Sequence, residues 1–260
     1  MLLTIKHVTQ YNYDTPVEFA LQKVRLRPLD ASIQTVRDWA LDVEGGRIET
    51  TYNDHYGNNV DLVSAEKGAQ KLTISASGTV ETRDAAGVLG RVYGRAPLWH
   101  FAQFTKLTTP GPNVEKLAKV VSSSKETLTG LHELSAAILQ AVPHETGHTH
   151  TETRVEEALE TGKGVCQDHA NIFISAARAA GLPARYVSGY IETEPPPGKE
   201  RLTGVDRTHA WVAVYLGGGD WIGIDPTNDQ MAGPRYVTTA RGRDYSDAQT
   251  VDEVVDAAAG

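Results

Sequence analysis

Cys166 is the only cysteine in this chain of 260 residues. Two glycines, Gly162 and Gly164, precede it, and apolar residues follow at helical spacing on one face: Ala170, Phe173, Ile174 and Ala177. The pattern predicts a thiol in the first turn of a buried helix, pointing into the protein. The free N–H groups and partial positive charge of a helix N-terminus stabilise a thiolate, the nucleophilic form of cysteine. A small apolar core cysteine fits the same residues equally well.

A histidine and an aspartate that could activate this thiol belong to two neighbouring strand-like stretches. His209 opens the first stretch, and Asp225 closes the second. The three glycines between them, Gly217–Gly219, predict a β-hairpin with a three-residue loop in which Leu216 pairs with Asp220. This odd loop length puts His209 and Asp225 on one face as diagonal neighbours, within side-chain reach.

These three residue types together suit nucleophilic catalysis. The imidazole takes the thiol proton, and a carboxylate on its other nitrogen fixes its orientation. The backbone N–H of Cys166 is one oxyanion donor, and the sequence identifies no second. Each residue also has a purely structural explanation. Asp225, for example, precedes Pro226 and is a good turn residue. Gly223, opposite Ala213, leaves space on the hairpin, where we expect the cysteine helix to pack.

The elements around these residues divide the chain in two. Residues 1–105 alternate apolar and polar positions, with turn signals about every ten residues, which predicts an all-β, sandwich-like domain. Residues 106–260 combine helical stripes with strands and predict an α+β domain that carries the site. Residues 85–113, rich in glycine and proline, read as the connection, and the tail beyond Asp247 reads as disordered.

Composition limits the possible functions. The chain is 40% hydrophobic and 22% charged, with a net charge of −8, and no basic patch points to nucleic acid. No run of 18 apolar residues predicts a membrane span. The N-terminus lacks the pattern of a signal peptide, and one cysteine forms no internal disulfide, so we expect a reduced, cytoplasmic setting. The sequence does not indicate an oligomeric state.

Five blocks and one turn carry a resemblance to a known family. GVCQD at 164–168, AAGLPARYVSGY at 179–190, THAWV at 208–212, GIDPTN at 223–228 and GRDYSD at 242–247 resemble bacterial transglutaminase-like cysteine peptidases. The turn DHYGN at 54–58 resembles part of the small β domain that accompanies such cores. The likeness covers nearly the whole chain.

The resemblance implies a papain-like, transglutaminase-like core with Cys166 as nucleophile, His209 as base and Asp225 as orienting carboxylate. It implies a thiol-dependent peptidase or amidase that forms a thioester on an amide or peptide, without a cofactor. Transfer of the acyl group to an amine, as in transglutaminases, remains open, and so does a non-catalytic binding module that keeps the fold.

Four further residues are predicted to contact the substrate: Gln167, His169, Arg185 and Trp211. The chain departs from the family at His169, where members often carry an aromatic residue, and at 142–145, where they carry aromatics before the cysteine. The wall that faces the substrate therefore differs from that of relatives.

Two other segments each have a functional interpretation and a purely structural one. His144, His148 and His150 are spaced so that they could hold a metal, and His169 could join them. A polar loop near the cleft fits better, and we predict no metal site. Cys166 and His209 could also bind zinc, but the order cysteine, histidine, aspartate fits nucleophilic catalysis better. The charged, proline-rich loop 194–207 is a solvated loop or a lid over the cleft.

Overall fold

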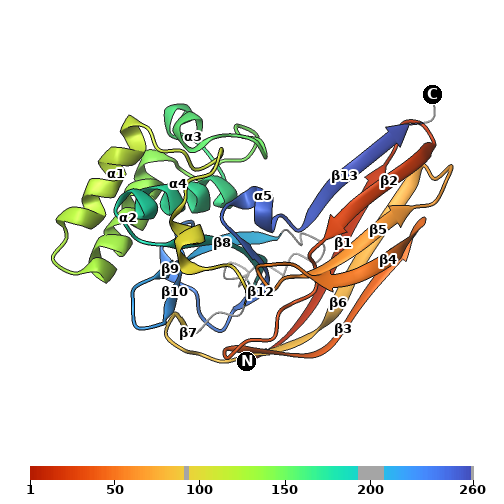
Figure 1. Cartoon of the computed structure of the whole chain (residues 1–260), viewed down its shortest axis with the longest axis horizontal. Coiled ribbons are helices and arrows are strands. Elements are labelled where there is room, and N and C mark those ends of the chain that lie inside the picture. The colour runs from red at the N-terminus through yellow and green to blue at the C-terminus, as the bar shows by residue number, and fades with distance from the viewer. Residues whose placement is uncertain (91–93, 193–207, 259–260) are drawn as a thin grey trace, which may run out of the picture.

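Two antiparallel sheets form a β-sandwich at one end of the molecule (Figure 1). The computed structural model describes residues 1–90, 94–192 and 208–258. One sheet has the strand order β1-β6-β3 and the other the order β13-β2-β5-β4. Their strands are β1 (Leu2–Asn12), β2 (Val17–Val24), β3 (Gln34–Glu44), β4 (Gly46–Asn53), β5 (Asn59–Ala65), β6 (Lys71–Thr82) and β13 (Val251–Ala258).

The core of the sandwich comes from the alternation of side chains along these strands. Successive residues of a strand face opposite sides, so apolar residues two apart lie on one face and meet the facing sheet. Val24 of β2 and Leu72 and Ile74 of β6 are fully buried in this core. The sandwich predicted from the alternating pattern is confirmed.

The C-terminal strand corrects the prediction of a disordered tail. β13 pairs antiparallel with β2, with Val251 opposite Val24 and Ala257 opposite Phe19. Alanine and aspartate are weak strand formers, so local composition favoured disorder there. Pairing with a distant strand edge supplies the backbone hydrogen bonds that composition alone does not indicate. The sandwich therefore draws on both ends of the described chain.

The rest of the chain builds an antiparallel sheet covered by helices. The strand order is β11-β10-β9-β8-β12, and β7 pairs with β10. These strands are β7 (Val88–Gly90), β8 (Ala184–Ile191), β9 (His209–Tyr215), β10 (Trp221–Asp225), β11 (Gln230–Met231) and β12 (Tyr236–Gly242). The helices are η1 (Leu98–Ala102), α1 (Pro112–Ser123), α2 (Thr127–Ala141), α3 (Val155–Thr161), α4 (Cys166–Ala179) and α5 (Tyr245–Ala248). This is the predicted α+β core, with a cysteine-bearing helix on an antiparallel sheet.

Helix α4 begins at Cys166, as predicted, and its apolar stripe is buried against β8 and β9. At its start the backbone N–H of Val165 donates to Asp168 Oδ2 at 2.8 Å. At its end Gly181 adopts a left-handed φ of 85°, and the N–H of Leu182 returns to the carbonyl of Ala177 at 2.9 Å. Both ends are therefore fixed by local hydrogen bonds.

The β9–β10 hairpin has the predicted register. Tyr215 lies opposite Trp221 and Val212 opposite Ile224, and the loop glycines 217–219 all have positive φ. One expectation was wrong: Gly223 faces Ala232 and Leu89, not α4. Helix α4 packs on the opposite face of the sheet, where Val212 and Val214 belong to the same buried cluster as its apolar residues.

The segment predicted as a plain connection joins the core sheet. β7 forms its edge beside β10, and η1 places Phe101 in a buried cluster with Trp211 and Trp221. The division into domains at residue 105 stays a prediction, since β7 precedes that point and β13 follows it.

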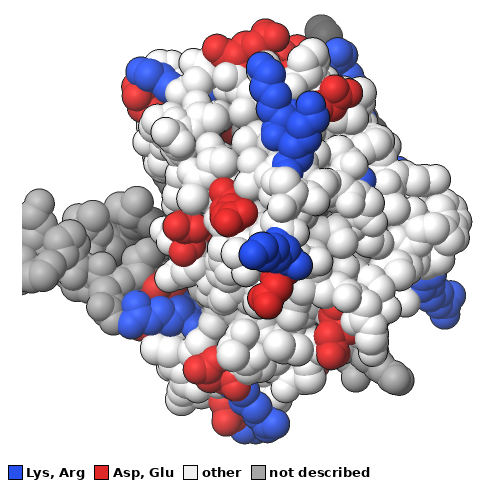
Figure 2. Space-filling view, turned by 90° about the vertical axis from the view of Figure 1, so that its left-hand side faces the viewer, with Lys and Arg blue, Asp and Glu red and all other residues white. Residues whose placement is uncertain are grey.

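The surface of the helical end mixes charges of both signs. Figure 2 shows Lys and Arg interspersed with Asp and Glu over this face. Among the residues described, no helix has the length and apolar character needed to cross a membrane.

Candidate active site

Asp225 ends β10 and is fully buried. Its Oδ2 accepts from His209 Nε2 at 2.6 Å, Asn228 Nδ2 at 2.6 Å and Tyr236 Oη at 2.7 Å. Its Oδ1 accepts from the backbone N–H groups of Thr227 and Asn228 at 2.9 and 3.2 Å. Burial acts to raise the pKa of Asp225, but these hydrogen bonds and the charge of His209 outweigh it and lower the pKa. Asp225 is therefore held as a carboxylate.

His209 begins β9, with its side chain 11% exposed. Its ring stacks on Trp211 at a centroid distance of 6.2 Å, which fixes the ring plane. Burial acts to lower the pKa of His209, whereas the hydrogen bonds to Asp225 and Cys166 raise it to about 9. Since Asp225 occupies Nε2, Nδ1 is the nitrogen left for the thiol.

Cys166 and His209 line one small cleft of about 90 Å³. Tyr186 and Ser188 of β8 form one wall, and Thr250 lies between α5 and β13 on another. Cys166 is half-buried at the first position of α4, where the helix leaves its N–H groups unpaired. The arrangement brings the three predicted residues together in the predicted order: thiol, imidazole, carboxylate.

Asp168 closes the helix start beside the thiol. Besides capping Val165, its Oδ2 accepts from Thr149 Oγ1 at 2.7 Å, which ties the loop before α3 to α4. These two hydrogen bonds engage the carboxylate in holding the backbone around Cys166. Burial raises the pKa of Asp168.

Two of the residues predicted to contact the substrate lie on α4, with different outcomes. Gln167 lines the cleft beside Cys166. His169 is fully buried, with Nε2 2.7 Å from the carbonyl of Val142 and Nδ1 3.0 Å from Thr227 Oγ1. Burial lowers the pKa of His169 to about 4, so the ring is neutral and donates to Val142. A substrate-contacting role for His169 does not fit this geometry.

Trp211 and Arg185, the other two residues predicted to contact the substrate, also lie away from the cysteine cleft. Trp211 is buried behind His209 and positions the imidazole rather than the substrate. Arg185 is adjacent to Tyr186 on β8, and adjacent strand residues face opposite sides. Tyr186 therefore reaches the cysteine cleft, whereas Arg185 lies over the ring of Trp221 at 4.1 Å, in a different cavity.

The histidines suggested as a metal site are engaged separately. His148 pairs with Glu145 at 2.7 Å, and the backbone of His150 accepts from Gln167 Nε2 at 3.3 Å. The ring of His144 lies 6.1 Å from that of His169. Over residues 1–90, 94–192 and 208–258, no three histidine, cysteine or acidic side chains converge as a metal site requires. The lid suggested for 194–207 lies outside the described residues.

Sequence reasoning missed Tyr236 and Asn228 as partners of Asp225. Asn228 stands three residues after Asp225, within the turn GIDPTN, so its proximity was a weak signal. Tyr236 belongs to β12, and two strands, β9 and β8, lie between β12 and β10 in the sheet order. No spacing along the chain indicates such a contact.

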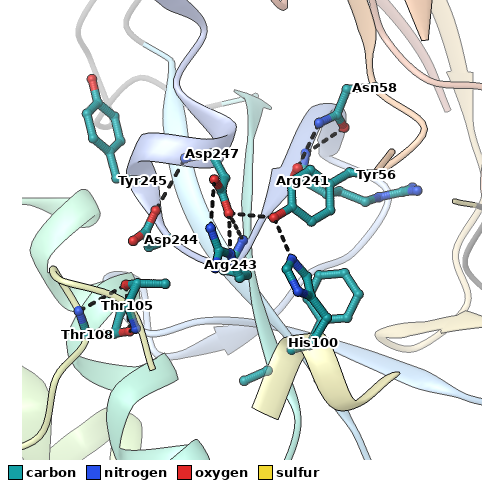
Figure 3. A network of polar contacts seen from close by, with 12 residues as sticks. Tyr56, Asn58, His100, Thr105, Thr108, Arg241, Arg243, Asp244, Tyr245 and Asp247 are labelled. Carbon is teal, nitrogen blue, oxygen red and sulfur yellow. Dashed lines mark hydrogen bonds and ion pairs between the residues drawn. The ribbon is translucent and has the colours of Figure 1, made fainter. Parts of the chain in front are cut away.

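A polar network ties the sandwich to the core beside the site (Figure 3). Tyr56, in the turn between β4 and β5, donates to Asp247 Oδ2 at 2.6 Å and lies 3.0 Å from His100 Nε2. Arg243 binds the same Asp247 oxygen at 2.8 Å. The two sequence blocks at 54–58 and 242–247 are therefore joined in space, next to α5 and the chain that lines the cleft.

Comparison with known proteins agrees with this architecture. Residues 115–226 match the transglutaminase-like superfamily, and residues 3–81 match the bacterial transglutaminase-like N-terminal region. An uncharacterized protein of Mycobacterium tuberculosis is 30% identical over 96% of this chain and 86% of its own length. The structure of a candidate cysteine protease from Cytophaga hutchinsonii superposes with a TM-score of 0.75 at 21% identity, covering 100% of this chain and 90% of that one.

A shorter match involves an enzyme of known reaction. A segment of 70 residues, 26% of this chain, is 37% identical to protein-glutamine gamma-glutamyltransferase of Pseudomonas aeruginosa, of which it covers 10%. The fold and the helix-borne cysteine thus define a thiol-dependent enzyme with a papain-like core. The chain belongs to the transglutaminase-like superfamily and carries that family's bacterial N-terminal region.

Proposed function

We propose that this protein is a thiol-dependent amide hydrolase that acts on a peptide or protein through Cys166, His209 and Asp225. The observation that carries the proposal is the 2.6 Å bond between a fully buried Asp225 and His209, which lines the same cleft as the thiol. A carboxylate locked by five donors supports a protonated imidazole, and a protonated imidazole supports a thiolate at neutral pH.

The proposed reaction follows from these positions. The Cys166 thiolate attacks the carbonyl carbon of an amide, and the backbone N–H of Cys166 stabilises the oxyanion. His209 donates its proton to the leaving amine as the C–N bond breaks, which leaves a thioester and a neutral imidazole. The imidazole then takes a proton from water, whose oxygen attacks the thioester and releases the acid and the thiolate.

Water is the acceptor that the cleft favours. A cleft of about 90 Å³ holds roughly three waters, and its lining includes Gln167, Ser188, Thr208 and Thr250. A polar lining keeps water near the thioester, which supports hydrolysis. Acyl transfer to a primary amine is the second candidate, and the 70-residue match to protein-glutamine gamma-glutamyltransferase favours it.

The thiol chemistry is tested by alkylation kinetics. Iodoacetamide should modify Cys166 at neutral pH at least about tenfold faster than free cysteine, and His209→Ala should remove this advantage. His148→Ala, in the loop before α3, is the matched control and should keep the wild-type rate. A wild-type rate equal to that of free cysteine would contradict the triad and leave a binding module with this fold.

The reaction type is tested with a peptide library. Wild-type protein and Cys166→Ala are incubated with the library, with and without a primary amine, and products are read by mass spectrometry. Cleaved or deamidated peptides that depend on Cys166 support hydrolysis. Amine-tagged peptides as the main product would assign the chain to transfer instead.

A further inference from the structure

A second cavity lies on the face of the core sheet opposite the cysteine cleft. It has a volume of about 410 Å³, and its walls include Tyr56, Phe101, Arg185, Tyr215, Trp221 and Arg241. Tyr186 and Ser188 line the cysteine cleft, whereas Arg185, between Ala184 and Tyr186, points to the other side of β8. What binds in this cavity is therefore separated by the sheet from Cys166.

Two buried arginines share this cavity without an acidic partner. Arg185 is 1% exposed, and its Nε and Nη2 atoms have no hydrogen-bond partner. Arg241 is 9% exposed, and within the described residues no carboxylate forms an ion pair with it. By contrast, the neighbouring Arg243 is bonded to Asp247.

The two arginines also affect each other. Burial, together with the like charge of Arg241, lowers the pKa of Arg185 well below its usual value. Burial lowers the pKa of Arg241 to about 10. Trp221, 4.1 Å from the Arg185 guanidinium, offsets only part of the cost of desolvating it. Buried charges are normally paired, so two adjacent unpaired ones point to a missing anion.

The backbone around these residues holds the arginines in place. Asn58 Nδ2 donates to the carbonyl of Arg241 at 2.7 Å, and the N–H of Arg241 donates to Asn58 Oδ1 at 2.8 Å. Figure 3 shows this clamp, with the Arg241 side chain running away from Asp247 and Arg243. On β8, Arg185 pairs with Ala213, which is too small to fill the space beside it. The backbone of Arg241 is therefore fixed at the wall of the cavity, and space is left beside Arg185.

The remaining walls are aromatic. Phe101 meets Trp221 edge to face at 5.4 Å, and Tyr215 lies against Trp221 at 5.6 Å. Such walls favour a planar or apolar group beside the charged one. We propose that this cavity binds a small organic dianion, an aromatic or similarly planar molecule with a phosphate or two carboxylates, whose charges pair with Arg185 and Arg241.

Binding is tested with defined probes at constant ionic strength. Phenyl phosphate carries its two negative charges on a ring as one phosphate, and isophthalate carries them as two carboxylates. Of the two comparison compounds, benzyl alcohol has a ring without charge, and inorganic phosphate has charge without a ring. Thermal shift and calorimetry should show that at least one ringed dianion binds more tightly than both comparison compounds. The ranking of phenyl phosphate against isophthalate identifies the anionic group.

Variants assign the binding to this cavity. Arg241→Met should weaken the better probe by about tenfold or more, because a charge-assisted bidentate contact is lost. Arg241→Lys should weaken it less, and Arg37→Met, on the exposed face of the sandwich, should not change it. Cys166→Ser should bind the probe like wild type, which separates this site from the proposed catalysis.

Ligand-free stability gives a second readout. Removing an unpaired buried charge should leave Arg241→Met at least as stable as wild type in buffer without the probes. The proposal is overturned if neither ringed dianion binds wild-type protein better than benzyl alcohol, a result that needs no variant to fold. It is also overturned if Arg241→Met binds the probes as wild type does.

Discussion

At the scale of single residues, the centre of the site is a buried charge with many donors. Asp225 has no exposed surface, yet it stays ionised because five hydrogen bonds, two of them from backbone, converge on its two oxygens. Removing any one donor shifts the balance between burial and hydrogen bonding. The imidazole of His209 responds, since its raised pKa depends on this carboxylate.

Protein stability should fall as pH rises through the titration of His209. Its pKa is near 6.5 in the unfolded chain and about 9 in the folded protein, so its contribution is complete below pH 6.5 and lost by pH 9. The loss is about 3 kcal/mol at most. Urea unfolding of wild type and His209→Gln between pH 6 and 9.5 measures it. An equal pH dependence in both proteins would contradict the assigned protonation.

Tyr236→Phe tests the support of Asp225. The change removes one of the donors that orient Oδ2, so the carboxylate is less well placed against the imidazole. Alkylation of Cys166 near neutral pH should slow by about 3- to 10-fold, the effect of one lost hydrogen bond to a charged group. Tyr52→Phe, at an exposed position of β4, is the control. A rate unchanged from pH 6 to 9 would show that Tyr236 only packs there.

Local spacing could predict the residues of the site that share a hairpin. The odd number of loop glycines determined that His209 and Asp225 face the same side, and the register confirms it. Spacing could not predict which face of the sheet α4 covers. The small residues at Ala213 and Gly223 suggested a groove for a helix, but that groove is filled by Ala232 and Leu89. Which of the two faces α4 covers is decided by packing across the whole sheet.

At the scale of elements, one arginine anchors the end of the cysteine helix. Arg178 donates Nε to the carbonyl of Phe101 at 2.8 Å and Nη1 to Thr108 Oγ1 at 3.1 Å. Its Nη2 donates to the carbonyls of Ala184 and Arg243 at 2.8 and 2.6 Å. A single side chain thus joins α4 to η1, β8 and the chain after β12.

Arg178→Met should destabilise the protein by about 3–5 kcal/mol, because it removes these bonds and leaves buried carbonyls unpaired. Denaturant unfolding measures the change in free energy. Arg37→Met, at an exposed arginine of β3, should change it by no more than about 0.5 kcal/mol. A loss below about 1 kcal/mol for Arg178→Met would mean that packing, not this arginine, holds the end of α4.

At the scale of the whole molecule, two of the contacts that link the sandwich to the core come from Tyr56 and from β13. Tyr56 reaches from the sandwich to Asp247, and β13 returns from the core to pair with β2. Neither contact was predictable from local sequence. The first needs a turn of β4–β5 to meet α5, and the second needs a strand edge that becomes available only when the sandwich forms.

Truncation after Thr250 should destabilise the sandwich. Removing β13 exposes the edge of β2 and abolishes its antiparallel pairing, at a cost of about 2–3 kcal/mol, or a Tm lowered by about 5–10 °C. Removal of residues 259 and 260 alone is the control. Calorimetry measures the difference, and light scattering reports association through the exposed edge. An unchanged Tm after removal of β13 would show that this strand adds nothing to the sandwich.

The return of β13 also determines the order in which the protein matures during synthesis. Val24 and its partner Val251 are separated by most of the coding sequence, so the ribosome releases the second long after the first. Until then, β2 of a nascent chain offers an open edge to chaperones and to neighbouring polysomes. The sandwich therefore completes only after the thiol, the imidazole and the carboxylate have all been translated.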